Sequence, residues 1–425
     1  MKIADVVLAA GTSGYFHKDM LAIKAGARAD GFLFHGPVLQ PGLKAIVEPA
    51  TVISVVLVLE DGQIAFGDCA DVIFAGVAGR DPVFHAEDHL DLLRAEVRPW
   101  LIGRAAEAFR ANAEEIDAAV FDGRRLHTAV RYGLSQALLH AAALAQRSTM
   151  AEVIAGAYGT SLATQPIPIL VSCPKDDPQQ LDRMVLKRAA LLPHAAFTVV
   201  ADHVGQKGEK LEAYARALAD RIRAIGAPGY RPRLHLDLYG TLGELFGDDL
   251  QAMASYLQGL GAIVRPYDLL IESPIIARTQ KDQIDRLRTL RHMVKAGSVP
   301  VGLIADEWCN TLDDVARFAD AQAADYLQIK TPDLGGITNT IEAILCCKAK
   351  GVGACLGGTA NETDQSARVC THIGLACGPD FMLSKPGLGG DEALMIQQNE
   401  MSRFFALIDA RRIGQPAAMP QTMTA

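Results

Sequence analysis

The stretch at residues 301–336 begins VGLIADEWCN and ends DYLQIKTPDLGG, and it decides the fold. It predicts two buried strands, at 301–305 and 326–330, each ending in polar side chains. Because strand side chains alternate between faces, Gln328 and Lys330 share one face. A lysine and a glutamine are costly to bury at the end of an apolar strand without a purpose. With the acidic pair DE directly after the first strand, the pattern predicts a metal ion beside a base.

The composition is that of an ordinary globular protein with room for two domains. Of 425 residues, 50% are hydrophobic and 21% are charged. The net charge of −8 and the absence of a dense basic run argue against a nucleic-acid partner. The eight cysteines form no CxxC pair, which favours reduced thiols. The start of the chain does not resemble a signal peptide and no apolar run is long enough for a membrane span, so we expect a cytoplasmic protein without a membrane partner.

Residues 1–160 carry the signals of an α+β domain. The run TVISVVLVLEDGQIAFGDCA at 51–70 contains two apolar stretches joined by Asp-Gly, which is a strong hairpin signal. Apolar residues recur every four positions at Val130, Leu134 and Leu138, which marks the buried face of a helix. Residues 158–167 are expected to link this domain to the next.

Strands and helices alternate from residue 161 to residue 391, which predicts an α/β fold with a closed (β/α)8 barrel. The eight expected strands lie at 167–172, 196–200, 233–239, 268–272, 301–305, 326–330, 352–356 and 381–384. Residues 392–425 are expected to form a helix that packs back on the first domain, followed by a frayed tail.

Three carboxylates follow three successive strands of the predicted barrel. Asp237 ends LHLD, Glu272 ends LLIE and Asp306 follows VGLIA, at spacings of 35 and 34 residues. The carboxyl ends of barrel strands meet on the face where active sites lie. Three carboxylates at close quarters repel, so a cation must offset them, and all-oxygen ligation favours Mg²⁺. A single acid at a strand end is more often a helix cap or a solvated residue, so the prediction depends on the trio.

Two candidate bases flank this trio. Lys330 lies one strand further on, and a lysine beside a divalent cation loses its proton more easily. Its alternative is a structural ion pair with one of the carboxylates. His194, near the second strand, is either a base on the opposite side or a structural histidine. Gln328 either orients the substrate or the lysine, or is a satisfied core amide. His235 alternates with Asp237 and is interpreted as structural.

Glycine-rich loops follow the seventh and eighth strands. In LGGTANET, the Thr359 hydroxyl and the neighbouring glycine amides are suited to binding a carboxylate. The loop KPGLGGDE is either part of a site or a set of tight turns. Neither a phosphate-binding P-loop nor a dinucleotide fingerprint is present, so a nucleotide site is disfavoured.

The motifs LHLDLYGT, IESP, ADEWCNT, QIKTPDLGG, GGTANET and KPGLGGDE resemble those of the methylaspartate ammonia-lyase family, in the enolase superfamily. In the first domain VLVLEDGQ, FGDCA, GRDP and GRRLHTAVRYGLSQA are similar too, so the resemblance covers nearly the whole chain. It implies a modified TIM barrel with an N-terminal α+β capping domain, assembled as a homodimer. It also implies Mg²⁺, an activating monovalent cation such as K⁺, and elimination of ammonia from threo-3-methylaspartate, a small amino-dicarboxylic acid, to give mesaconate.

The resemblance carries roles over by position. The positions that match the family's Mg²⁺ ligands are Asp237, Glu272 and Asp306. Lys330 matches the base for the (S) centre, and His194 matches the base for the opposite face. Gln328 and Thr359 match substrate-binding residues, and Leu383 matches a residue that lines the pocket for the methyl group.

Three positions in the substrate-binding set depart from the family pattern. Ile73 and Ser172 stand where the family has glutamines, and Ala360 stands where it has a cysteine. A lost hydrogen bond to a substrate group typically costs about 0.5–3 kcal/mol, so these changes predict weaker binding or a different substrate. Ile73 favours a bulkier side chain or an N-alkyl group on the aspartate.

Two other functions are compatible with the same residues. The first is an enolase-type dehydratase, racemase or epimerase that acts on another carboxylic acid. The second is a non-catalytic descendant that binds a metal and a small acid, which the intact Asp/Glu/Asp/Lys set disfavours.

Overall fold

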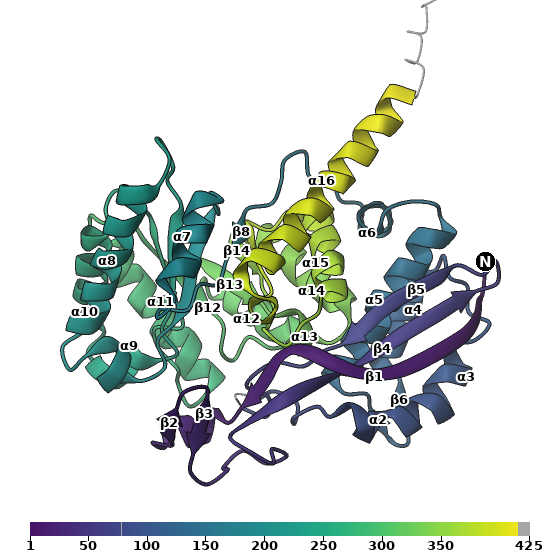
Figure 1. The fold of residues 1–425 in the computed structure, drawn as a ribbon, viewed down its shortest axis with the longest axis horizontal. Coiled ribbons are helices and arrows are strands. Elements are labelled where there is room, and N and C mark those ends of the chain that lie inside the picture. The colour runs from purple at the N-terminus through teal and green to yellow at the C-terminus, as the bar shows by residue number, and fades with distance from the viewer. Residues whose placement is uncertain (78, 415–425) are drawn as a thin grey trace, which may run out of the picture.

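The structure of the protein is a computed structural model that describes residues 1–77 and 79–414, with side chains as far as Arg411. Figure 1 shows a barrel beside a second unit that contains a three-stranded sheet, with the helix α16 projecting from the barrel side. The predicted frayed tail lies outside the described residues. No helix in the described part of the chain is long and apolar enough to span a bilayer.

The first 160 residues form an antiparallel sheet covered by helices. The elements are β1 (Ile3–Lys18), α1 (Met20–Lys24), β2 (Arg28–Asp30), β3 (Leu33–His35), β4 (Val47–Leu59), β5 (Ile64–Cys69), α2 (Ala86–Leu92), a π-helix (Leu93–Val97), α3 (Arg98–Leu101), α4 (Phe109–Ala118), β6 (Val120–Phe121), β7 (Arg124–Arg125), α5 (Thr128–Ala145) and α6 (Met150–Tyr158). The sheet order is β1-β4-β5, and the predicted hairpin at Asp61-Gly62 is confirmed.

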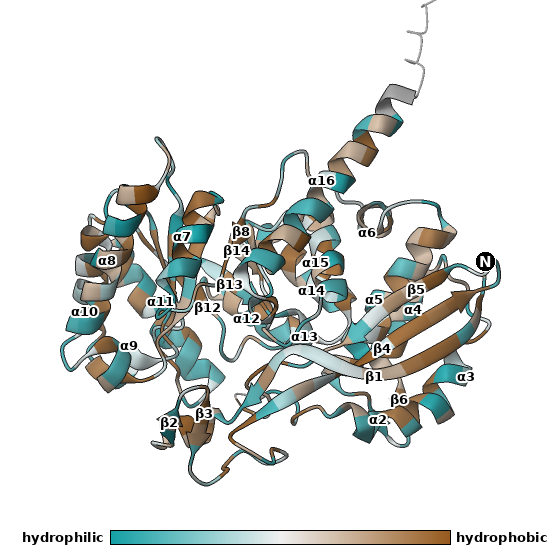
Figure 2. Ribbon diagram, in the orientation of Figure 1, coloured by the Kyte–Doolittle hydropathy of each residue, from teal (hydrophilic) through white to brown (hydrophobic). Residues whose placement is uncertain are grey.

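Helix α5 packs on this sheet because its small residues allow close approach. Gly133 lies directly against the backbone of Asp68 and Cys69, where any side chain on the glycine would overlap. The predicted apolar positions of the helix are buried, with Val130 and Leu138 at most 1% exposed. Figure 2 shows that β4, at the centre of the sheet, is largely hydrophobic. The 3.6-residue period in the sequence therefore identified the core face of α5 correctly.

The second part of the chain is a closed barrel of eight parallel strands, which confirms the predicted fold class. The strands are β8 (Ile169–Leu170), β9 (Leu191–Ala196), β10 (Arg233–Asp237), β11 (Leu269–Glu272), β12 (Val301–Ala305), β13 (Tyr326–Ile329), β14 (Gly353–Leu356) and β15 (Phe381–Leu383). The helices are α7 (Pro178–Leu186), α8 (Glu209–Ile225), α9 (Thr241–Phe246), α10 (Leu250–Ile263), α11 (Gln280–Lys295), α12 (Leu312–Asp320), α13 (Thr331–Leu334), α14 (Ile337–Ala349), α15 (Asp364–Cys377) and α16 (Gly390–Gly414).

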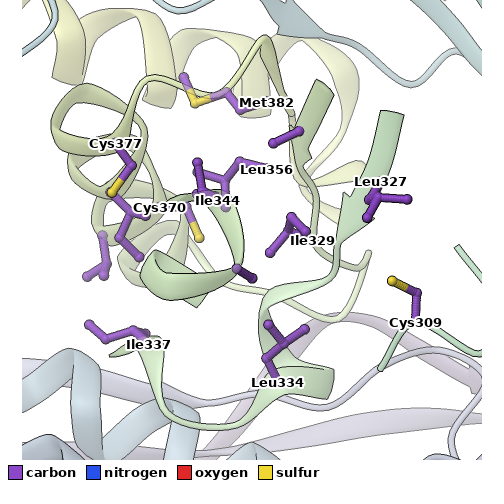
Figure 3. Packing of buried hydrophobic residues seen from close by; sticks show 14 of the residues in the cluster. Cys309, Leu327, Ile329, Leu334, Ile337, Ile344, Leu356, Cys370, Cys377 and Met382 are labelled. Atoms are coloured by element: carbon purple, nitrogen blue, oxygen red, sulfur yellow. The ribbon is translucent and has the colours of Figure 1, made fainter. Parts of the chain in front are cut away.

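Apolar side chains fill the barrel and the layer outside it. The interior cluster is buried and comprises Leu170, Leu191, Leu270, Ile304, Cys355, Phe381 and Leu383. Figure 3 shows part of the outer layer, in which Ile329, Leu334 and Cys370 belong to one packed cluster. The interior is thus a packed core, and polar chemistry is confined to the ends of the strands.

The prediction of the second barrel strand is wrong. The sequence analysis placed it at 196–200, and the structure places β9 at Leu191–Ala196. Pro193 lies inside β9, and a proline within an apolar run argues against a central strand. Residues after 196 turn instead into a π-helix (Val200–Val204), where the His203 ring accepts hydrogen bonds from the Thr198 and Val199 amides. The correction places His194 inside a strand.

Helix α16 lies against α15 and α7 of the barrel. Near its end Arg411 forms an ion pair with Glu152 of α6, at 2.6 Å. The expected docking on the first domain therefore corresponds in the structure to contact through α6. The proposed division at residues 160 and 391 stays a prediction.

Candidate active site

The three predicted carboxylates lie at the carboxyl ends of neighbouring strands. Asp237 and Glu272 are register partners at the ends of β10 and β11, and Asp306 directly follows β12. Their exposed fractions are 3%, 1% and 5%. All three line one cavity of about 540 Å³, together with both candidate bases. The barrel topology therefore brings these acids to the same cavity, as their spacing predicted.

Burial and mutual repulsion disfavour ionisation of the first two acids. Burial raises the pKa of Asp237 well above its ordinary range, and the charges of Glu272, Glu307 and Asp306 add to the shift. Burial also raises the pKa of Glu272, to about 7. Asp306 differs because Lys330 and Arg80 outweigh its burial and lower its pKa. The site thus holds more negative charge than its own cations neutralise.

Lys330 forms an ion pair with the third acid. Its Nζ lies 2.6 Å from Asp306 Oδ2, and the lysine side chain is 16% exposed. Although burial opposes the charge on Lys330, the attraction of Asp306 raises the lysine pKa. The structure therefore contains the ion pair that the sequence left open as an alternative. It also places the amine in the cavity, where a base would be needed.

Arg80 is a site residue that the sequence analysis did not single out. Its Nε donates to Asp333 Oδ2 at 2.8 Å, and its guanidinium lies 4.0 Å from Asp306 Oδ1. The side chain is 5% exposed and lines the cavity. An arginine in a loop gives no periodic signal, because its partners are more than 200 residues away in the chain.

Two histidines meet Glu272 on the other side of the cavity. His194 lies in β9 with a positive φ of 49°, and its Nε2 is 3.9 Å from Glu272 Oε2. His235 of β10, interpreted from sequence as structural, is closer, at 2.9 Å from the same oxygen. Burial lowers the pKa of His194 to about 4 and that of His235 to about 3, so both rings are neutral at pH 7. His235 is therefore part of the site.

Gln328 projects from β13 toward the same acid. Its amide nitrogen donates to Glu272 Oε1 at 3.2 Å, and its own oxygen has no hydrogen-bond partner. The side chain is buried and lines the cavity. One amide group is thus satisfied within the protein, and the other is available to a ligand.

The remaining predicted substrate-binding residues also line the cavity, and they are Ile73, Ser172, Thr359, Ala360 and Leu383. The Ile73 amide donates to the Thr359 hydroxyl at 3.2 Å, which joins the loop after β5 to the loop after β14. Because that hydroxyl accepts from Ile73, its own proton is free to point at a ligand. Ser172 contributes its backbone carbonyl to Gln180, at 3.2 Å.

The residues present fit a divalent cation. Glu272 Oε2 is buried without a hydrogen-bond partner, and the pKa values of Asp237 and Glu272 are raised for want of positive charge. The three carboxylates offer hard oxygen ligands of the kind Mg²⁺ prefers. A softer set shares Glu272, because its ligand atom and those of His194 and His235 lie within 4.8 Å of one another. The assignment of Asp237, Glu272 and Asp306 stays a prediction.

Comparison with known proteins identifies the family. Models of the methylaspartate ammonia-lyase N-terminus and C-terminus match residues 1–159 and 161–410. Methylaspartate ammonia-lyase 2 of Carboxydothermus hydrogenoformans is 47% identical over 97% of this chain and 99% of its own length. The chain belongs to the methylaspartate ammonia-lyase family. The resemblance stated from the motifs is therefore confirmed, and the chain is a member of a carbon–nitrogen lyase family.

Solved structures of methylaspartate ammonia-lyases agree with the fold. The Mg-complex of β-methylaspartase from Clostridium tetanomorphum superimposes with a TM-score of 0.91 at 44% identity, covering 97% of this chain and all of that one. The Citrobacter amalonaticus methylaspartate ammonia-lyase containing (2S,3S)-3-methylaspartic acid gives 0.92 at 42% identity, covering 96% and 100%. A muconate lactonizing enzyme from Pseudomonas fluorescens, at 16% identity and a TM-score of 0.62, shares the fold alone.

Proposed function

We propose that this protein eliminates ammonia from threo-3-methylaspartate to give mesaconate in a Mg²⁺-dependent reaction. One observation carries the proposal. The strands β9 and β13, which deliver His194 and Lys330, are diametrically opposite in the eight-stranded barrel order. A substrate held between them would present a carbon to a base on either face, with three carboxylates beside it.

The chemical difficulty is the acidity of the carbon next to a carboxylate. Removing its proton builds a second negative charge on that carboxylate. A divalent ion held by Asp237, Glu272 and Asp306 would stabilise this charge and make Lys330 a better base. Lys330 Nζ takes the proton from the (S) centre, and the C–H electron pair becomes the new C=C bond. The C–N bond of the neighbouring carbon breaks, and ammonia leaves with its electron pair.

Other residues hold and orient the substrate. The free amide oxygen of Gln328 and the proton of the Thr359 hydroxyl supply one acceptor and one donor to the cavity. Leu383 lines the pocket for the substrate methyl group. His194 takes the proton when the opposite stereoisomer is bound, since its ring reaches the cavity from the other wall. K⁺ as an activating ion and a homodimeric assembly belong to the same proposal.

The test is a spectrophotometric assay for mesaconate. Purified protein is mixed with (2S,3S)-3-methylaspartate and Mg²⁺, and the absorbance of the conjugated product is followed. We expect turnover that EDTA abolishes and excess Mg²⁺ restores. Exchange of solvent deuterium into the acid without ammonia release would instead favour a racemase or epimerase.

The cavity favours a second candidate substrate class, aspartates with a larger apolar substituent. Its volume of about 540 Å³ lies in the range of sites for drug-sized ligands. The walls above the carboxylates are apolar, and they include Ile73, Phe74, Phe34, Ile276 and Trp308. Comparing kcat/KM for 3-methylaspartate with that for longer β-alkyl and N-alkyl aspartates separates the two. A clear preference for 3-methylaspartate would refute the larger class.

A further inference from the structure

A buried ion pair lies directly beneath the substrate-binding loop. Lys385 Nζ is 2.7 Å from Glu362 Oε2, and both side chains are 0% exposed. Burying two charges costs several kcal/mol per ion before their attraction is counted, so such a pair is weak evidence for stability. The pair joins the residue that follows the loop of Thr359 to the segment that follows β15. Its contacts indicate what it does.

The Glu362 carboxylate accepts four hydrogen bonds from different parts of the chain. Its Oε2 accepts from the Thr359 amide at 2.9 Å as well as from Lys385. Its Oε1 accepts from the Tyr132 hydroxyl at 2.5 Å and from the Thr331 hydroxyl at 3.3 Å. Burial raises the pKa of Tyr132 well above its ordinary value, which keeps that hydroxyl protonated as a donor. One carboxylate therefore ties together helix α5, the loop after β14, and the start of α13.

These contacts end next to predicted site residues. Thr359 is itself a predicted substrate ligand, and Thr331 directly follows Lys330 in the chain. Lys385 also donates to the Gly357 carbonyl at 3.2 Å, which fixes the other end of the same loop. Gly358 lies so close to the pair that a Cβ on it would overlap both charged groups. The loop that carries Gly358, Thr359 and Ala360 into the cavity thus rests on the pair.

We propose that Glu362, held by Lys385 and Tyr132, is a positioning residue that fixes the 357–360 loop and Lys330 for the reaction. For its kinetic consequence this inference rests on the proposed function. Its structural consequence, order in the loop, can be measured without any turnover.

Two variants separate positioning from general stability. Tyr132→Phe removes one donor to Glu362 and keeps the ring that packs in the core. Loss of one such hydrogen bond should raise KM about 2- to 13-fold and change kcat less. Glu362→Gln combined with Lys385→Met removes both charges together, which is often neutral for stability, while the loop loses its anchor. The double variant should therefore fold with a near-normal Tm and still bind substrate weakly.

Asp325→Asn is the matched control. Asp325 is a buried acid paired with Arg291 at 2.8 Å, and it lies just before β13, at the end of the strand opposite Lys330. Losing this ion pair should lower Tm and leave KM unchanged. Hydrogen–deuterium exchange of peptides covering 331–334 and 357–362 is measured for every variant.

The expected result is faster exchange in these two segments in Tyr132→Phe and in the double variant, but not in Asp325→Asn. The higher KM should accompany it. Wild-type exchange in both segments, or a KM no higher than that of the control, would overturn the positioning role. If wild-type protein turns over no aspartate, the proposed function fails alone, because the exchange pattern still decides the positioning role.

Discussion

Replacing Lys330 by methionine tests the assigned base most sharply. Methionine keeps much of the length and apolar stem of the lysine and removes the amine. Removing a general base typically lowers the rate about 10²–10⁴-fold. The loss should be specific to one stereoisomer, since His194 still faces the other side of the cavity.

The same change should destabilise the metal-free protein. At an effective dielectric constant of about 20, the attraction of Lys330 for Asp306 across 2.6 Å is about 6 kcal/mol. That of Arg80 across 4.0 Å is about 4 kcal/mol. Asp306 therefore keeps one cationic neighbour, and desolvation offsets part of the lost attraction. We expect the free energy of unfolding in EDTA to fall by about 3–5 kcal/mol.

The assay compares wild type, Lys330→Met and His194→Ala. Initial rates are measured with the (2S,3S) isomer and with the isomer of opposite configuration at C3, each with saturating Mg²⁺. Lys330→Met should lose the first activity and retain more of the second, and His194→Ala should show the reverse. Urea unfolding with and without Mg²⁺ reports stability. If Lys330→Met keeps wild-type activity on the (2S,3S) isomer, the amine is only a structural partner of Asp306 and the reasoning fails.

Three further predictions concern the substrate pocket, the loop and the outer helices. Ile73→Gln should lower kcat/KM for aspartates with long apolar substituents relative to 3-methylaspartate, and an unchanged ratio from competition assays would count against the apolar wall. Gly358→Ala should lower Tm and raise KM, because φ is +148° and a Cβ would meet the Glu362–Lys385 pair; calorimetry and kinetics that match wild type would contradict this. The His372 hydrogen bond lowers the pKa of Glu400 to about 2, so its folded pKa lies below its unfolded value and its stabilisation is complete above about pH 4.5 and lost toward pH 2. The stability difference between wild type and Glu400→Gln in urea should therefore shrink from pH 6 to pH 3, and a constant difference would show that the carboxylate charge contributes nothing.

The sequence predicted the parts of the site that depend on strand ends. Asp237, Glu272 and Asp306 each follow a short apolar run, and the barrel places such ends on one face whatever the exact register. Lys330 was found by the same regularity. The strand containing His194 was misplaced because Pro193 interrupts its apolar run, and the smoother run after it looked more like a strand.

Residues whose roles depend on distant partners could not be found in this way. His235 looks like any core histidine until β11 places Glu272 at 2.9 Å from its ring. Arg80 meets Asp333 across 253 positions of the chain, and Tyr132 meets Glu362 across 230. Neither periodicity nor spacing encodes such contacts. They follow only from the way in which the first domain closes over the barrel.

Locating the bound cation tests the central claim most directly. The experiment is a crystal structure of the protein with Mn²⁺ in place of Mg²⁺, and with the anomalous signal used to place the ion. The account predicts one strong peak within bonding distance of carboxylate oxygens from Asp237, Glu272 and Asp306. A peak on His194, His235 and Glu272 instead, or no peak near the three carboxylates at saturating Mn²⁺, would contradict it.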